Sequence, residues 1–128
     1  MNQVRLLSQD DTLGAVHDVT DPSWAEVEKA LERLDGKRWT QVGMVIAEER
    51  HMIVGGGPDG YVLSCQRGET LFSLRAPERG GRGMRSVVCG QRAEFPEDEV
   101  VAWDAVLAAA AAYYHSAALA PNLQWREY

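Results

Sequence analysis

The spacing of hydrophobic residues predicts a helix near each end of the chain. In the first helix, apolar residues recur every three or four positions and share one face; they are Trp24, Val27, Leu31 and Leu34. Thr20 or Asp21 is expected to cap this helix, with Pro22 at its first position and Gly36 closing it. The second helix is predicted over residues 104–116, where an alanine-rich run leads into two tyrosines.

Between the helices the hydrophobic period falls to two, which is typical of half-buried strands. Strands are predicted over residues 40–47, 51–54, 61–66, 70–75 and 85–89. The gaps between the first four strands are shorter than the dozen residues that a parallel crossover needs, so we expect an antiparallel meander. Residues 4–19 alternate weakly and predict one or two further short strands.

Residues 95–103 fit two interpretations. Pro96 followed by three acids is typical of a helix start, whereas Val100 and Val101 before Asp104 are typical of a short edge strand that leads into a helix. We favour the edge strand. The pattern as a whole predicts one α+β domain over residues 1–128, with a mostly antiparallel sheet of four to six strands and two main helices.

Four glycines are predicted to form turns, because glycine adopts backbone conformations that other residues avoid; they are Gly55, Gly56, Gly57 and Gly90. The first three precede Pro58 and should interrupt the strand before it. A phosphate-binding loop is the alternative. That loop would need a Gly-Lys-Ser/Thr or GxGxxG pattern opening a helix, and here a predicted strand follows.

The composition describes an acidic globular protein. Of the 128 residues, 45% are hydrophobic and 25% are charged, a balance that excludes a disordered chain. With 13 basic and 19 acidic residues the net charge is −6, which disfavours direct nucleic-acid binding. No apolar run is long enough to span a membrane, and no secretory signal is visible, so we expect a cytoplasmic protein.

Charge is distributed unevenly along the chain. Residues 1–36 carry eight acids and three bases (−5), and residues 93–128 carry six acids and one base (−5). Residues 67–92 carry six arginines and two acids (+4), and Arg79, Arg82 and Arg85 form a basic loop region. We favour pairing of these arginines with the acidic segments over contact with phosphate.

Candidate catalytic and metal-binding groups are sparse. His17, His51 and His115 lie far apart in sequence and match no zinc-ligand spacing, so no metal or cofactor is predicted. Cys65 shares a strand face with Tyr61 and is interpreted as a small buried hydrophobic residue. Four clustered carboxylates are interpreted as a solvated acidic edge or a protein-binding patch; they are Glu94, Glu97, Asp98 and Glu99.

The order of these motifs resembles the first-numbered family of immunity proteins in bacterial polymorphic toxin systems. The resemblance rests on a glycine triplet after a strand, a second Gly90-Gln91 turn and Trp125 after a proline, and it spans residues 22–126. Cys89 stands where the family tends to have another glycine, and Trp103 stands where a polar residue is more usual.

The resemblance implies a non-enzymatic inhibitor that binds a cognate secreted toxin. Toxins paired with such proteins often act on nucleic acid as deaminases or nucleases, and the expected mechanism is occlusion of the active site. From the sequence we expect exposed acids and aromatic anchors to make this contact; the predicted residues are Asp59, Tyr61, Glu97, Asp98, Glu99 and Trp103.

Two other functions remain open at this stage. A small nucleotide- or phosphate-binding enzyme would use the glycine-rich turn. A self-associating structural domain would use an exposed strand edge. For the inhibitor we expect a monomer or a weak homodimer.

Overall fold

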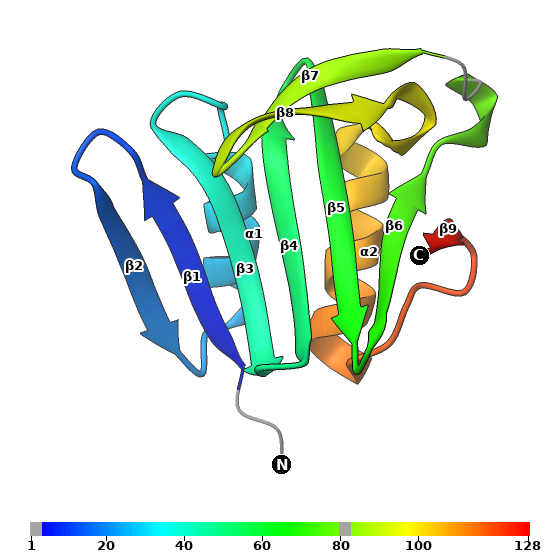
Figure 1. The fold of residues 1–128 in the computed structure, drawn as a ribbon. Helices are drawn as coiled ribbons and strands as arrows, with labels where there is room; N and C mark the ends of the chain where they lie inside the picture. The colour runs from blue at the N-terminus through cyan, green and yellow to red at the C-terminus, as the bar shows by residue number, and fades with distance from the viewer. Residues whose placement is uncertain (1–3, 80–82) are drawn as a thin grey trace.

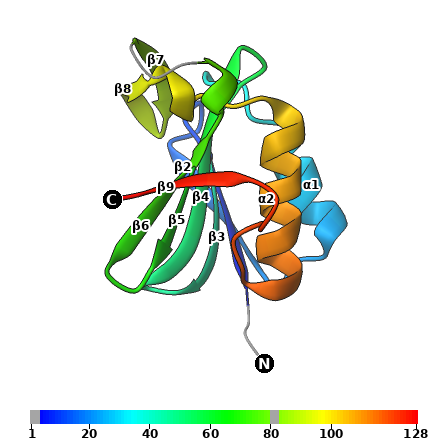
Figure 2. The same cartoon turned by 90° about the vertical axis from the view of Figure 1, so that its right-hand side faces the viewer.

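The computed structural model describes residues 4–79 and 83–128. Two helices pack on one face of a seven-stranded antiparallel sheet, and a two-stranded hairpin lies across the other face (Figures 1 and 2). The sheet has the strand order β2-β1-β3-β4-β5-β6-β9. The α+β class with two main helices is confirmed, but the predicted four to six strands are too few.

The main sheet contains β1 (Arg5–Asp10), β2 (Ala15–Thr20), β3 (Trp39–Ala47), β4 (Arg50–Gly57), β5 (Gly60–Arg67), β6 (Thr70–Arg75) and β9 (Gln124–Glu127). The helices are α1 (Trp24–Glu32) and α2 (Trp103–Ser116), and the hairpin pairs β7 (Met84–Cys89) with β8 (Gln91–Pro96). Strands β3 to β6 form the predicted meander. Sequence analysis missed β8 and β9, because β8 is mostly exposed and β9 has four residues, so neither has a long alternating pattern.

Helix α1 begins at a capping box. The Ser23 hydroxyl accepts the N–H of Glu26 (3.1 Å), and the Glu26 carboxylate accepts the N–H of Ser23 (3.0 Å). The prediction that Thr20 or Asp21 caps the helix, with Pro22 inside it, is therefore wrong. These residues precede the cap, since Ser23 alone places a hydroxyl on the free N–H groups of the first turn.

One hydrophobic core fills the space between the sheet and the helices. Alternate residues of the strands point into it, as the period of two predicted. Its buried members from the sheet include Leu6, Val42, Met44, Met52, Val54, Leu63, Cys65 and Leu74, and those from the helices include Val27, Ala30, Leu31, Val106, Ala109, Ala110 and Tyr113. Small alanines on α2 let the helix backbone approach the sheet closely.

The hairpin β7–β8 makes a second, smaller core on the opposite face. Val87 of β7 packs against Val62 of β5 and Val100, with Cys89 and Phe95 at its margin. The turn of the hairpin is held by the N–H of Gly90, which donates to the carbonyl of Thr40 (2.9 Å). Gly90 lies between β7 and β8 with φ +73°, a conformation that glycine adopts without strain.

The prediction that Gly55, Gly56 and Gly57 form a turn is wrong. All three lie within β4 and pair with Val62, Tyr61 and Gly60 of β5. Because these glycines lack side chains, other segments of the chain can pass close to the strand. A Cβ on Gly55 would lie 2.6 Å from Cys89 Cα, and one on Gly57 would lie 3.1 Å from Asp35 Cα. Because the glycines are engaged in the strand ladder, they form no phosphate-binding loop.

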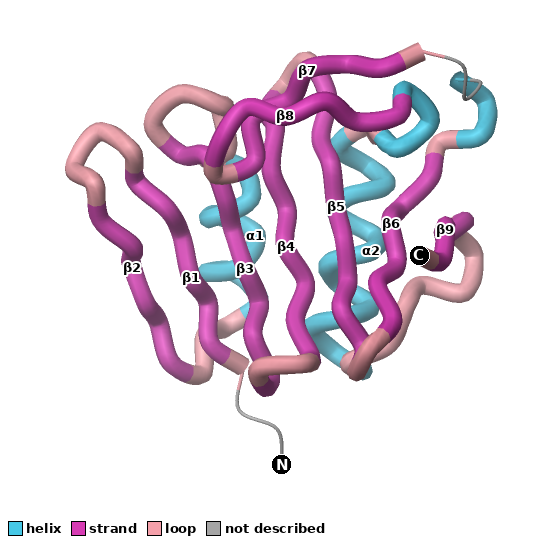
Figure 3. Tube along the Cα trace, in the orientation of Figure 1, coloured by secondary structure: helices cyan, strands magenta, loops and turns pink. Residues whose placement is uncertain are grey.

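Several loops gather at one edge of the sheet, which is uppermost in Figures 1 and 3. They are residues 11–14 between β1 and β2, residues 33–38 between α1 and β3, and Pro58-Asp59 between β4 and β5. The hairpin β7–β8 crosses the sheet near the same edge. Part of the loop predicted over residues 77–83, including Arg82, lies outside the described residues. We refer to this edge as the loop edge.

Candidate partner-binding surface

Asp59 projects from the loop edge at the tight turn between β4 and β5. Its side chain is exposed, and its carbonyl accepts a hydrogen bond from Arg85 Nη2 of the hairpin (2.8 Å). The next residue, Gly60, has φ +147°, and a Cβ there would lie 2.5 Å from Val100. The turn is therefore fixed from both sides, with the Asp59 carboxylate left to solvent.

Tyr61 and Trp103 line a hollow of about 280 Å³ beside this turn. The start of α2 is fixed to β5 because Tyr61 and Val101 exchange two backbone hydrogen bonds, 2.9 and 2.7 Å long. The ring centroids of Tyr61 and Trp103 lie 5.7 Å apart, with Tyr61 buried and Trp103 partly exposed. Burial raises the pKa of the Tyr61 hydroxyl. Three predicted residues, Asp59, Tyr61 and Trp103, thus meet at one hollow.

The three predicted acids of residues 97–99 form a single 3₁₀ turn, and two of them are buried. The expectation that Asp98 and Glu99 are exposed is wrong, since they are 1% and 3% exposed. Asp98 pairs with Arg75 (3.0 Å) and Arg126 (2.6 Å), and Glu99 accepts hydrogen bonds from Arg126 (2.5 Å), Ser73 (2.8 Å) and the Tyr128 hydroxyl. Hydrogen bonds from Arg126 hold the pKa of Asp98 below its usual value, against the effect of burial.

This buried cluster attaches the C-terminal strand to the 3₁₀ turn that follows the hairpin. Arg126 comes from β9 and Arg75 from β6, so the two acids link three segments that are far apart in sequence. Sequence analysis missed Arg75, Arg126 and Tyr128, because ion pairs across 23 and 28 residues leave no local spacing signal. The expected pairing of the arginine-rich segment with an acidic one holds for Arg75. It is wrong for Arg79 and Arg85, which form no ion pair among the described residues, and Arg82 lies outside them.

Glu97 stays at the surface. It is half-buried, its N–H donates to the carbonyl of Gly83 (2.9 Å), and its carboxylate lies close to Gly83. It does not line the hollow of Tyr61 and Trp103. Of the predicted contact residues, Glu97 therefore lies apart, and Asp98 and Glu99 are buried and line none of these hollows.

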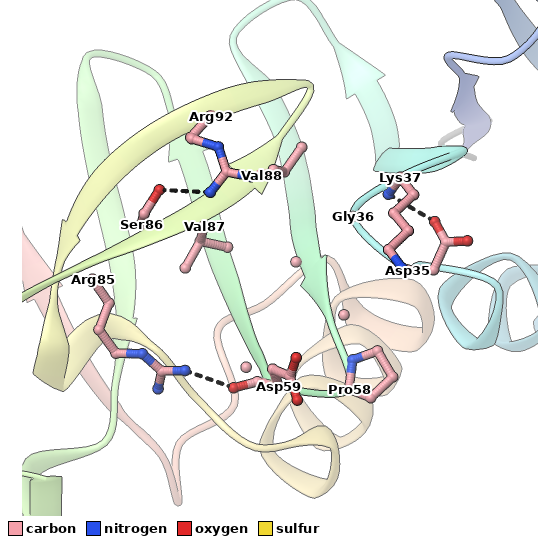
Figure 4. Close-up of a pocket in the computed structure, with 13 residues that line it drawn as sticks. Asp35, Gly36, Lys37, Pro58, Asp59, Arg85, Ser86, Val87, Val88 and Arg92 are labelled. Carbon is pink, nitrogen blue, oxygen red and sulfur yellow. Dashed lines mark hydrogen bonds between the residues drawn. The ribbon is translucent and has the colours of Figure 1, made fainter.

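Two further hollows adjoin the first through shared lining residues. One, of about 220 Å³, lies between the loop at Asp35 and the hairpin, and it shares Pro58, Asp59 and Gly60 with the first (Figure 4). The other, of about 450 Å³, lies beside α2 and the C-terminal segment and shares Val101 and Ala102. We call these three adjoining hollows together the furrow.

Neither cysteine in the described part of the chain has an activated thiol. Burial raises the pKa of both thiols, Cys65 and Cys89, to about 11, which keeps them protonated and poorly nucleophilic at neutral pH. Within residues 4–79 and 83–128, no three His, Cys, Asp or Glu side chains lie close enough together to hold a metal ion. Cys65 is buried, as predicted.

Comparison with known proteins places the chain in a family of immunity proteins. The family model described as Immunity protein Imm1 matches residues 15–127, from the start of β2 to the end of β9. The chain therefore belongs to the Imm1 immunity protein family, as its motifs indicated. Neither the curated proteins nor the solved structures include a significant match. No helix in the described part of the chain is long and apolar enough to cross a membrane.

Proposed function

We propose that the protein is the immunity partner of a secreted toxin in a bacterial polymorphic toxin system, and that it acts as a non-catalytic inhibitor. Membership of the Imm1 family is the observation that carries this proposal. The protein would act in the cytoplasm of the producing cell and its kin, where an incoming or newly made toxin has to be blocked. Inhibition requires binding only, in keeping with protonated thiols and scattered histidines.

The toxin in this proposal acts on nucleic acid, as a deaminase or a nuclease. Such an enzyme needs a basic cleft to hold phosphates, and a protein with a net charge of −6 complements it. Complementary charge chiefly speeds association and selects the partner. The inhibitor would neutralise the toxin by covering its active site.

The furrow is the surface that we assign to the toxin. It is concave, it is built from loops held by backbone hydrogen bonds, and it contains a partly exposed tryptophan beside an exposed acid. Interfaces tend to draw most of their affinity from a few aromatic and charged anchors. We propose Trp103, Tyr61 and Asp59 as those anchors, with Glu97 at the rim and Asp98 and Glu99 in a supporting role.

Affinity capture followed by co-expression tests the function. The tagged protein is expected to retain a single toxin domain from a lysate of its own organism, and co-expression should relieve the killing caused by that domain. If toxin domains of the neighbouring locus are present in the lysate and none is retained, the proposal fails. A toxin that is retained and still kills the co-expressing cells would also contradict it.

A further inference from the structure

The part of the furrow shown in Figure 4 is surrounded by cations. Lys37 from the α1–β3 loop and Arg85 and Arg92 from the hairpin line this hollow of about 220 Å³, together with Val87 and the backbone of Gly56 and Gly57. In Figure 4, Lys37 lies on one side of the opening and the two arginines lie on the other. Three positive charges thus converge on one cavity of an acidic protein.

These cations have no acidic partner within the described part of the chain. Four arginines of the fold pair with carboxylates, Arg5 with Asp18, Arg38 with Asp10, and Arg75 and Arg126 with Asp98, whereas Arg33, Arg50, Arg67 and Arg79 form no ion pair among the described residues. No such ion pair forms with Lys37, Arg85 or Arg92 among the described residues. Acids outnumber bases in the chain, so this lack of pairing does not reflect a shortage of carboxylates.

Both guanidinium groups are nevertheless held in place. Arg85 Nη2 donates to the carbonyl of Asp59 (2.8 Å), and Arg92 Nη1 donates to the hydroxyl of Ser86 (3.0 Å). A guanidinium has five N–H donors, so each arginine keeps several donors for a further acceptor. Arginines that are already oriented lose less conformational entropy on binding, and their planar forks match a carboxylate.

The two acids that line the same hollow, Asp35 and Asp59, form no ion pair with its cations. Asp35 is exposed, and its Oδ1 accepts the N–H groups of Lys37, Arg38 and Trp39 at 2.9–3.0 Å; these bonds hold its pKa below the usual value. Its charge is thus already balanced by backbone donors. Asp59 is exposed at the turn, where its backbone carbonyl and not its carboxylate meets Arg85.

We propose that this hollow is a carboxylate-binding site that receives one aspartate or glutamate side chain of the bound toxin. The proposal rests on the proposed function for the identity of the partner. The hollow, of about 220 Å³, is large enough to admit a single side chain. Val87 and Val88 also line the hollow and add apolar surface beside the cations.

A protein carboxylate suits the site better than a nucleic-acid phosphate. A phosphate backbone is bound by a row of cations that follows the strand, and affinity grows with the number of phosphates neutralised. Here the cations surround one small hollow, with Asp35 and Asp59 at its margin and a net charge of −6 on the whole chain. These charges would repel a second and a third phosphate.

A titration without the toxin tests the site directly. In ¹H–¹⁵N spectra that include the arginine Nε–Hε signals, N-acetylaspartate N-methylamide is added at constant ionic strength. The signals of Arg85, Arg92, Gly56 and Gly57 are expected to shift and saturate, while that of Arg67 at the far end of the sheet stays unchanged. The variant Arg92→Gln should weaken the response about tenfold, which matches the loss of one charged hydrogen bond. Shifts that follow ionic strength alone, or tighter binding of inorganic phosphate or a dinucleotide, would overturn the proposal.

The captured toxin provides the second measurement. Arg92→Glu is expected to weaken toxin binding at least about tenfold, whereas the matched surface change Arg67→Glu should leave affinity within about twofold. If Arg92→Glu binds as tightly as the unchanged protein, the carboxylate site is wrong and the immunity function stands. If the unchanged protein binds no toxin, the immunity function fails, and the titration still decides whether the hollow takes a carboxylate.

Discussion

The close crossing of the hairpin over β4 gives a quantitative prediction for Gly55→Ala. A Cβ at this position would lie 2.4 Å from Cys89 Cβ and 2.6 Å from both Cys89 Cα and Sγ. Carbon atoms in contact prefer a separation of about 3.5–4.0 Å. The hairpin would therefore have to move by about 1 Å, away from Val62 and away from the hydrogen bond between Gly90 N–H and Thr40.

The expected loss in the free energy of unfolding is about 2–3 kcal/mol, near the upper end for overpacking, because the nearest atoms include backbone. Gly43→Ala is the matched control. Gly43 lies in the adjacent strand β3, and a Cβ there meets only the Met52 carbonyl at 3.8 Å, an ordinary contact. That variant should be unchanged or more stable by up to about 1 kcal/mol, because alanine reduces the entropy of the unfolded chain.

Urea unfolding followed by tryptophan fluorescence measures both variants, with linear extrapolation to water. Gly55→Ala should also lower the Tm by about 6–15 °C for a chain of this size. Adding Cys89→Gly to Gly55→Ala should restore part of the stability, since it removes the Cβ and Sγ contacts and leaves the one with Cα. If Gly55→Ala and Gly43→Ala behave alike, the hairpin does not cross β4 as described.

Three further predictions concern acid stability, the first helix and association. Asp98 has a lowered pKa in the folded protein because of its hydrogen bonds with Arg126. The unfolded chain therefore binds more protons than the folded one once the pH falls below the ordinary carboxyl range. The free energy of unfolding should hold from pH 7 to about 5 and decline below about 4. Asp98→Asn should flatten this decline in pH-dependent urea unfolding, and an unaltered decline would be inconsistent with the buried cluster. Ser23→Ala should lower the free energy of unfolding by about 1 kcal/mol, whereas Thr20→Ala should change it little; the reverse order in the same assay would contradict the cap. Strand β2 is an edge strand of the sheet, and its Val16 is 60% exposed. Sedimentation should therefore show a monomer, or a weak dimer that Val16→Lys abolishes. A tight dimer that survives this change would exclude the edge of β2 as its contact.

Local features were predictable from the sequence, and contacts between distant segments were not. The apolar spacing of Trp24, Val27 and Leu31 determines a helix, and alternation determines β3 to β6, because both signals lie within a few neighbouring residues. The capping box was also readable, as Ser23 and Glu26 have its spacing, although the nearby Thr20 and Asp21 gave a competing start.

The glycine triplet illustrates the limit of local rules. A run of three glycines before a proline is typical of a turn, and the structure uses it inside a strand because Cys89 passes over Gly55. Asp98 and Glu99 likewise have the pattern of an exposed acidic turn until Arg75 and Arg126 are brought to them by the sheet. The meeting of Asp59, Tyr61 and Trp103 at one hollow depends on the pairing of Tyr61 with Val101, 40 residues further along the chain.

Titration of the toxin's own activity tests the proposed function most directly. The captured toxin domain would be assayed on its nucleic-acid substrate while the purified protein is added in increasing amounts. We predict that activity falls to zero at a fixed stoichiometric ratio, and that Trp103→Ala shifts the inhibition curve by at least about tenfold, as an aromatic anchor would. A toxin that remains active when saturated with the protein would contradict inhibition by occlusion, and a Trp103→Ala variant that inhibits as well as the unchanged protein would place the interface elsewhere.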